Sequence, residues 1–259
     1  MNAAIRLRGV GVTYRSGLFG TGRSVHALQD VDLEVPAGSI TGIVGESGSG
    51  KSTLGRVVLG LQKPTTGTVQ VLGLDPCKLS GGAHQAQRRQ IQSVFQDSGA
   101  SLNPRRTIVS SVREGLDIHK IGPAETRDAR AADLLEQVGL GREHLGRFPH
   151  SLSGGQRQRV NIARALAVSP RVLVADEPVS ALDLSVQAQV LSLLRDAHHR
   201  WNLTMLLISH DLSVIRALCD HVVVMRQGRV VEAGETACVM NAPRMPYTMQ
   251  LLADAMEIG

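Results

Sequence analysis

The motif G-x-x-x-x-G-K-S at residues 45–52 constrains the fold more than any other feature, because it follows the apolar run SITGIV and precedes the helical pattern STLGRVVLG. A glycine-rich loop between a strand and a helix lets backbone N–H groups surround an anion, and the helix N-terminus adds its positive dipole end. We expect Lys51 to reach the β- and γ-phosphates of a nucleotide and the Ser52 hydroxyl to ligate Mg²⁺. The segment therefore predicts an α/β core that binds a nucleoside triphosphate.

The composition fits such a core. Apolar residues make up 42% of the chain, but there are only one Trp, two Tyr and three Phe, so Val, Leu, Ile and Ala must fill the interior. Such residues suit a parallel sheet covered by helices. No apolar run reaches the roughly 18 residues of a membrane-spanning helix, and the start MNAAIRLRGV has no hydrophobic signal region. We expect a chain that neither spans a membrane nor is secreted, with Cys77, Cys219 and Cys238 as reduced thiols.

The charge gives little information about partners. The formal net charge is +5, and the arginines are spread from Arg6 to Arg244 rather than gathered in one segment. A bias toward arginine codons explains this pattern at least as well as a polyanionic partner does. We therefore expect no nucleic-acid partner.

The pattern of elements changes twice along the chain. Short alternating or apolar runs separated by Gly, Pro and Asp indicate strands in the first ninety or so residues, with an exposed loop at 16–25. From about 98 to 165 the apolar spacing is helical. Strand patterns then return at 171–178, 204–210 and 221–234, where they alternate with helical patterns near 184–200 and 211–219. This order predicts an α/β core interrupted by a helical insertion.

Polar side chains follow three of the predicted strands. Asp176 and Glu177 end the run RVLVADE, His210 ends TMLLISH, and Gln96 ends IQSVFQ. The carboxyl ends of neighbouring parallel strands meet at one edge of a sheet, where a phosphate loop also lies. We expect Asp176 to hold Mg²⁺ through water and Glu177 to act as general base. Taken alone, two solvated carboxylates would explain the acidic pair equally well.

The other two side chains have complementary roles in this hypothesis. His210 could reach the γ-phosphate and hold the geometry of the attacking water, although a lone histidine at a strand end is more often structural. Gln96 carries a neutral amide that can touch both Mg²⁺ and water, and it stands where the helical region begins. We therefore expect Gln96 to respond when the helices move.

The stretch SLSGGQRQR at 151–159 places two glycines and two hydroxyls before a basic helix. It holds no acid, no metal ligand and no activated nucleophile. Such a segment can bind a phosphate, but it cannot by itself catalyse a reaction on one.

Taken in order, GESGSGKS, FQD, LSGGQRQR, LVADEP, SALD and ISHD resemble the ATPase subunits of ABC transporters over nearly the whole chain. The resemblance implies a P-loop NTPase core of the ABC ATPase type, with an antiparallel β subdomain and an inserted α-helical subdomain. The implied single domain has its core at 1–96 and 166–259 and its helical subdomain at about 97–165. ATP and Mg²⁺ are the implied ligands. The implied ATP-binding residues are Tyr14, which would stack on adenine, and Gly45, Glu46, Ser47, Gly48, Ser49, Gly50, Lys51, Ser52 and Thr53.

The same resemblance gives the stretch at 151–159 a role. In the family, this signature loop binds the γ-phosphate of an ATP held by a second ATPase subunit in a head-to-tail pair. The residues implied to contact the partner's ATP are Ser153, Gly154, Gly155, Gln156 and Asp183. The lack of catalytic groups in this loop is then expected.

Two further segments narrow the resemblance. FQDSGASLNPRRTI and APRMPYTMQLL are similar to segments of importers of dipeptides, oligopeptides and nickel, with Met245 in place of the usual histidine. The second segment predicts a tail helix within 243–259. Only Cys238 lies nearby, so no iron–sulfur centre is implied. The chain resembles the shorter ATPase of a pair, which implies a non-identical partner.

These features lead to a hypothesis with two alternatives. The leading hypothesis is an ATPase bound at the cytoplasmic face of the cell membrane to two permease subunits, which an extracytoplasmic solute-binding protein supplies. The first alternative is a soluble ABC-type ATPase assembled with phosphonate-degrading enzymes. The second, an ATP-binding regulatory subunit without hydrolysis, would require the loss of Glu177 or His210. The transported solute is not encoded in this chain, because the ATPase does not touch it.

Overall fold

The computed structural model describes residues 3–15, 24–96 and 101–257. The chain divides into two units, of which the first comprises residues 1–80 and 204–259 and the second comprises 81–203. Most of the predicted loop at 16–25 and residues 97–100 lie outside the described residues. The expected subdomain limits at 97 and 165 stay a prediction. Among the described residues, no helix combines the length and the apolar character that crossing a membrane requires.

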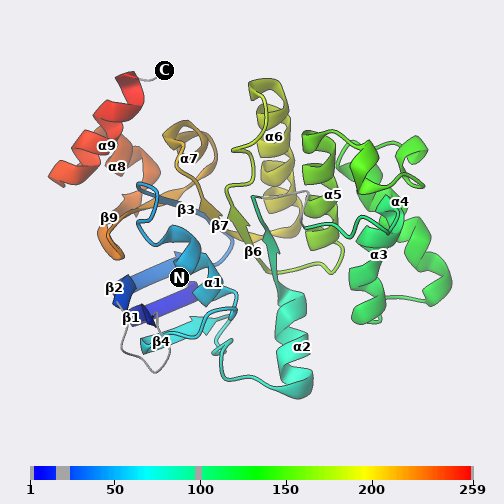
Figure 1. Cartoon of the computed structure of the whole chain (residues 1–259), viewed down its shortest axis with the longest axis horizontal. Coiled ribbons are helices and arrows are strands. Elements are labelled where there is room, and N and C mark those ends of the chain that lie inside the picture. Colours follow the sequence, from blue (N-terminus) through cyan, green and yellow to red (C-terminus); the bar gives the residue numbers. More distant parts are fainter. Residues whose placement is uncertain (1–2, 16–23, 97–100, 258–259) are drawn as a thin grey trace. The chain divides into compact units, whose positions relative to one another are not determined.

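The first unit contains an antiparallel sheet of strands β1 (Ala3–Arg15), β2 (Ser24–Pro36) and β4 (Thr66–Val71), in the order β2-β1-β4 (Figure 1). Leu7 of β1 pairs with Leu33 on one side and Val69 on the other. These three side chains are buried, and alternation along the strands places them on one face. The antiparallel β part implied by the resemblance is therefore present.

The first unit also contains the parallel strands that hold the phosphate loop. Strands β7 (Thr204–Ile208), β3 (Ile40–Val44), β8 (His221–Arg226) and β9 (Arg229–Glu235) lie side by side in this order. β3 is parallel to both neighbours, whereas β8 and β9 form an antiparallel hairpin. The run at 221–234 is thus two strands joined by a turn. Strands β3 and β7 are buried at every position, as the continuous apolar runs in the sequence predict.

The described part of the first unit contains four helices, namely α1 (Lys51–Val58), α7 (Leu212–Leu218), α8 (Thr236–Asn241) and α9 (Pro246–Glu257). Helix α1 begins directly after the phosphate loop, as the sequence predicts. Asp211 caps α7, because its carboxylate accepts the backbone N–H of Ser213 at 2.8 Å. Helix α9 lies within the predicted tail helix at 243–259.

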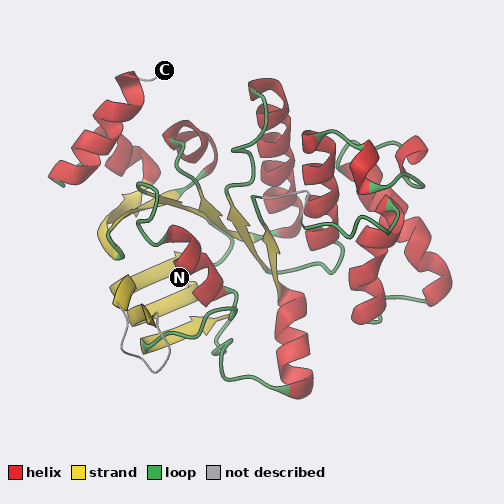
Figure 2. Ribbon diagram, in the orientation of Figure 1, coloured by secondary structure: helices red, strands yellow, loops and turns green. Residues whose placement is uncertain are grey.

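The second unit is mainly helical (Figure 2). Two short parallel strands, β5 (Ile91–Val94) and β6 (Val172–Asp176), are accompanied by five α-helices in its described part. These helices are α2 (Gly81–Gln90), α3 (Ile108–Ile118), α4 (Arg127–Gln137), α5 (Gly154–Leu166) and α6 (Leu184–Trp201), with single 3₁₀ turns η2 (Ala124–Thr126), η3 (Arg142–His144) and η4 (Pro149–Ser151). Helix α2 was not anticipated from the sequence. Gln87 is its one buried residue, so it has no apolar periodicity to detect.

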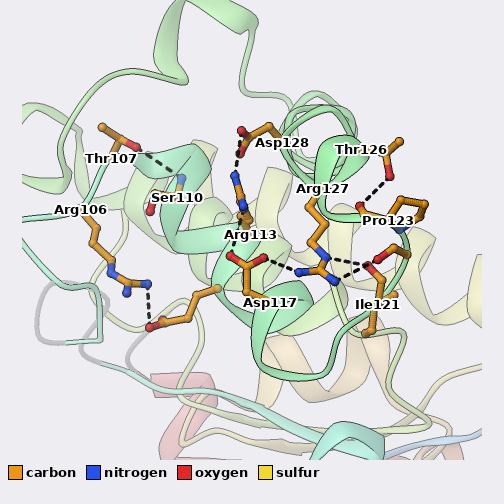
Figure 3. Close-up of polar contacts among 12 residues, drawn as sticks. Arg106, Thr107, Ser110, Arg113, Asp117, Ile121, Pro123, Thr126, Arg127 and Asp128 are labelled. Carbon is orange, nitrogen blue, oxygen red and sulfur yellow. Dashed lines mark hydrogen bonds and ion pairs between the residues drawn. The ribbon is translucent and has the colours of Figure 1, made fainter.

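A network of charged side chains joins α3 to α4 (Figure 3). Asp117 accepts from Arg113 at 3.0 Å and from Arg127 at 2.8 Å, and Arg113 also contacts Asp128 at 3.0 Å. Hydrogen bonding from Arg127 is the main cause that lowers the pKa of Asp117. Arg127 also donates to the carbonyl of Ile121 in the connecting turn. One guanidinium thus links both helices and their connection, which fixes this part of the helical unit.

Candidate functional site

The phosphate loop at 45–50 has backbone conformations that require glycine at two positions. Gly45 has a φ of 147°, and a Cβ there would lie 2.1 Å from the carbonyl oxygen of Met225. Gly50 has a φ of 103°, and its Cβ would lie 2.5 Å from the carbonyl oxygen of Ala27. Because neighbouring backbone approaches both residues so closely, no side chain fits at either position.

Lys51, the first residue of α1, folds back over this loop. Its ammonium donates to the carbonyl oxygens of Gly45 at 2.7 Å and Glu46 at 2.9 Å, and the residue is only 7% exposed. The first turn of α1 holds no acidic residue. A buried cation and the positive end of the helix dipole therefore meet at this loop, which favours an anion. Ser52 is half-buried in the same turn.

The tail helix contacts the phosphate loop through a residue that sequence reasoning missed as a site residue. The backbone N–H of Glu46 donates to the hydroxyl of Tyr247 at 3.3 Å. The Tyr247 ring is buried, which raises the pKa of its hydroxyl, and the guanidinium carbon of Arg226 lies 4.6 Å from the ring centroid. Tyr247 belongs to the segment APRMPYTMQLL, which marks the resemblance to the importer branch but does not indicate a contact with the phosphate loop.

His210 lies in the same unit as the phosphate loop. It follows β7 by two residues, and Ile208 of β7 pairs with Ile43 of the parallel strand β3. The register places His210 and the loop after Val44 at the same edge of these two strands. His210 is exposed. Tyr14, the residue predicted to stack on adenine, lies on β1 of the antiparallel sheet and is 39% exposed. It donates its hydroxyl proton to the amide oxygen of Gln62 at 3.3 Å.

The acidic pair and Gln96 come together in the second unit. Val94 of β5 pairs with Ala175 of the parallel strand β6, so Gln96 and Asp176 emerge at the same edge. Glu177 has a φ of 51°, in the left-handed region that residues with side chains rarely adopt. Such strain costs about 1–3 kcal/mol and is concentrated at functional sites.

Gln158 of helix α5, the helix that begins at the signature loop, holds the segment that follows Glu177. The Gln158 amide donates to the carbonyl of Pro178 at 2.8 Å, and Gln158 is 2% exposed. This bond links α5 to the chain just beyond the acidic pair. Sequence reasoning missed Gln158, because nothing in the pattern GGQRQR distinguishes a buried glutamine from a solvated one.

The signature loop is held by its own helix cap. The Ser153 hydroxyl accepts the N–H of Gln156 at 3.2 Å, and the Gln156 side chain accepts the N–H of Ser153 at 2.9 Å. This capping box fixes the first turn of α5, with Gly154 and Gly155 inside it. The amides of that turn and the positive end of the helix dipole would favour an anion at this end of α5.

Asp183 lies next to this turn because α5 and α6 begin in contact. A Cβ on Gly155 would lie 2.3 Å from Cγ1 of Val186, so only glycine permits this approach. Asp183 caps α6 by accepting the N–H of Val186 at 3.0 Å and the hydroxyl of Ser185 at 2.7 Å. The Ser185 bond is the main cause that lowers the pKa of Asp183. The second unit thus gathers all five residues predicted to contact a partner's ATP, namely Ser153, Gly154, Gly155, Gln156 and Asp183.

Tyr247→Phe should lower the free energy of unfolding by about 1 kcal/mol, because the backbone N–H of Glu46 would lose the acceptor of a part-buried hydrogen bond. Tyr14→Phe removes a hydroxyl at an exposed position and serves as the matched control, with an expected cost below about 0.5 kcal/mol. Denaturant unfolding of the full chain measures both. Equal effects of the two variants would contradict a special role for the Tyr247 hydroxyl.

Gly155→Ala should destabilise the chain by about 1–3 kcal/mol, because its new methyl group would collide with Val186. Val186→Ala removes the colliding Cγ1 and leaves Val186 Cβ at 3.5 Å, an ordinary contact distance. The double variant should therefore be more stable than the sum of the two single effects predicts. Strict additivity in thermal or denaturant unfolding would show that the two helices do not meet in this way.

Comparisons with known proteins identify the family of this chain. The "ABC transporter" family model matches residues 28–180. A putative peptide import ATP-binding protein of Brucella ovis is 49% identical over 87% of the chain and 71% of the relative. The oligopeptide transport ATP-binding protein OppF of Streptococcus mutans is 43% identical over 98% of the chain and 82% of the relative. The glutathione import ATP-binding protein GsiA of Salmonella paratyphi A is 46% identical over 92% of the chain, which spans 38% of that relative.

Solved structures show the same fold. The ATP-binding cassette MJ0796, solved as a dimer in a post-hydrolysis state bound to ADP and Pi, matches with a TM-score of 0.80 and 32% identity over 90% of this chain and 98% of its own. CbiO1 of Clostridium perfringens, part of the complex cbiONQ, matches with a TM-score of 0.78 and 26% identity over 96% of this chain and all of its own. The family model covers more than half of the chain, and the first two relatives are matched over most of their length. The chain therefore belongs to the ABC transporter family, as an ATP-hydrolysing cassette.

Proposed function

We propose that this chain is the ATPase subunit of an ABC importer, which couples ATP binding and hydrolysis to the uptake of peptides or a related small solute, nickel included. The observation that carries the proposal is that the chain holds two phosphate-binding elements. One is a phosphate loop with a buried lysine, and the other is the capped first turn of α5 at residues 153–156, called the signature turn below. Relatives named for the import of peptides, oligopeptides and glutathione support the direction of transport and the class of solute. No feature of the chain favours the soluble, permease-free alternative.

The ATP-binding residues of the proposal are those of the phosphate loop. Lys51 would neutralise charge on the β- and γ-phosphates, and the backbone amides of 45–50 would surround the β-phosphate. Tyr14 would stack its exposed ring on adenine. The remaining contacts are assigned to Glu46, Ser47, Ser49, Ser52 and Thr53.

The hydrolytic step uses the residues that follow the strands. Glu177 would accept a proton from the attacking water, and His210 would orient the γ-phosphate against that water. The Gln96 amide would contact both Mg²⁺ and the attacking water. Asp176 and the Ser52 hydroxyl offer the hard oxygen ligands that Mg²⁺ prefers, so the donor set fits this ion. When bound, Mg²⁺ neutralises charge that develops on the phosphates.

The partner in the proposal is a second ATPase subunit, in a head-to-tail pair. The signature turn has phosphate-binding amides but no catalytic side chain, so it suits a phosphate held by another chain. Leu184, next to Asp183, is 84% exposed, which is unusual for a large apolar side chain and fits burial against a partner. The dimer of the MJ0796 cassette supports the pairing. A non-identical second subunit is the arrangement that the branch resemblance favours.

The remaining partners follow from the importer assignment. Two membrane permeases would transmit the closing and opening of the ATPase pair, and an extracytoplasmic binding protein would deliver the solute. The chain would then act at the cytoplasmic face of the cell membrane. Closure on ATP and reopening after hydrolysis and product release would drive the cycle.

Glu177→Gln should retain ATP binding but lower the hydrolysis rate by about 10²–10⁴, because a neutral amide cannot accept the proton. The ATP-bound pair should then accumulate, which size-exclusion chromatography with ATP would detect. Glu125→Gln changes an exposed glutamate of the same unit and should leave the rate unchanged. Hydrolysis by Glu177→Gln at the native rate would refute the assignment of the base.

A further inference from the structure

A cavity of about 550 Å³ lies within the second unit, and none of its lining residues is among those assigned to ATP binding or hydrolysis. One face of α2, the turn after α3 and the turn before β6 form its walls (Figure 1 shows α2 and α3). Its charged or titratable lining residues are Arg89, His119, Lys120 and Arg171. The volume falls in the range of about 300–1,000 Å³ that is typical of small-ligand sites.

The cavity is strongly cationic. Among the described residues that line it, none is an aspartate or a glutamate. Within the part of the chain that the structure describes, Arg89, Lys120 and Arg171 also form no ion pair with a carboxylate. Other arginines of the same unit, such as Arg113 and Arg127, are paired with carboxylates. Three basic side chains without a carboxylate partner in the described ranges therefore line this cavity together.

Hydrogen bonds hold the walls of the cavity in place. The Arg89 Nε donates to the carbonyl of Val168 at 3.3 Å, which ties α2 to the turn before β6. The Gln85 amide donates to the carbonyl of Ile118 at 3.2 Å, which ties α2 to the end of α3. These bonds fix the relative positions of the three segments that line the cavity, whereas Lys120 and Arg171 extend from them as exposed side chains.

The pKa of His119 depends on the burial and the positive charge within the cavity. Burial lowers its pKa, and the charge of Arg89 lowers it further. Both causes disfavour another positive charge at this position. An anion in the cavity would reverse the second effect, so the His119 pKa would rise on binding.

We propose that this cavity binds a small, multiply charged anion with phosphate groups, at a site separate from the catalytic nucleotide. Arginine presents a planar fork that matches phosphate oxygens, and two arginines with one lysine match an anion of more than one charge. None of the lining residues belongs to the phosphate loop or the signature turn. The proposal does not depend on the importer assignment.

The test is a titration of the full chain with inorganic pyrophosphate, followed by NMR of the histidine ring protons. His119→Gln identifies the His119 signal by its loss. Pyrophosphate should raise the His119 pKa by about one unit, in a saturable manner, at millimolar concentration. Because pyrophosphate can also occupy the phosphate loop, the response must persist in Lys51→Ala. An unchanged His119 pKa, or a response that Lys51→Ala abolishes, would overturn the proposal.

Single substitutions to glutamine in the same pyrophosphate titration test which positive side chains bind the anion. Lys120→Gln and Arg171→Gln should each weaken the pyrophosphate response by about tenfold or more in apparent affinity, since a charge-assisted bond is worth about 1.5–3 kcal/mol. Arg142→Gln, at an exposed arginine paired with Glu136, should leave it unchanged. Equal weakening by all three would contradict a specific site. A second result would also contradict the proposal: anionic phospholipid vesicles bind in a manner that requires Lys120 and Arg171, while pyrophosphate has no effect. The anion would then be a lipid headgroup.

Discussion

The hydrogen bonds between the Lys51 ammonium and the carbonyl groups of the phosphate loop are the interaction on which the rest of the structure depends. A buried cation is costly unless it is hydrogen-bonded, and the carbonyls of Gly45 and Glu46 supply those bonds. The loop can present them only because glycine at 45 and 50 allows close contact with the neighbouring backbone. Strand β3, helix α1 and the tail residue Tyr247 then fix the two ends and the middle of this loop.

Each unit contributes a different half of the proposed chemistry. The first unit brings the phosphate loop and His210 to one edge of β3 and β7, whereas the second brings Gln96 and the acidic pair to one edge of β5 and β6. The second unit also carries the capped signature turn beside Asp183. Because this turn would bind phosphate without acting on it, the proposed function requires a second subunit, and hydrolysis would be a property of a pair.

The sequence predicted the features that depend on local pattern. The phosphate loop, helices α1, α6 and α7 and the strands that precede Asp176 and His210 follow from apolar periodicity and glycine spacing. Helix α2 was missed because its single buried residue is polar, so it carries no amphipathic signal. Its hydrogen bonds to Val168 and Ile118 come from residues 33 or more positions away, which no local pattern encodes.

Long-range contacts also explain the site residues that sequence reasoning missed. Tyr247 meets Glu46 across 201 positions, and Gln158 meets Pro178 across 20. The strained backbone of Glu177 is likewise invisible in the motif. Motifs thus predict which groups would carry the chemistry, whereas only the structure identifies the residues that hold those groups in place.

Purification of the tagged chain from detergent-solubilised membranes of its native host, with mass spectrometry of the co-purifying proteins, tests the central claim most directly. We expect a second ATPase with its own phosphate loop, together with two permeases, in stoichiometric amounts. Recovery only from the soluble fraction, with metabolic enzymes and no permease, would contradict it.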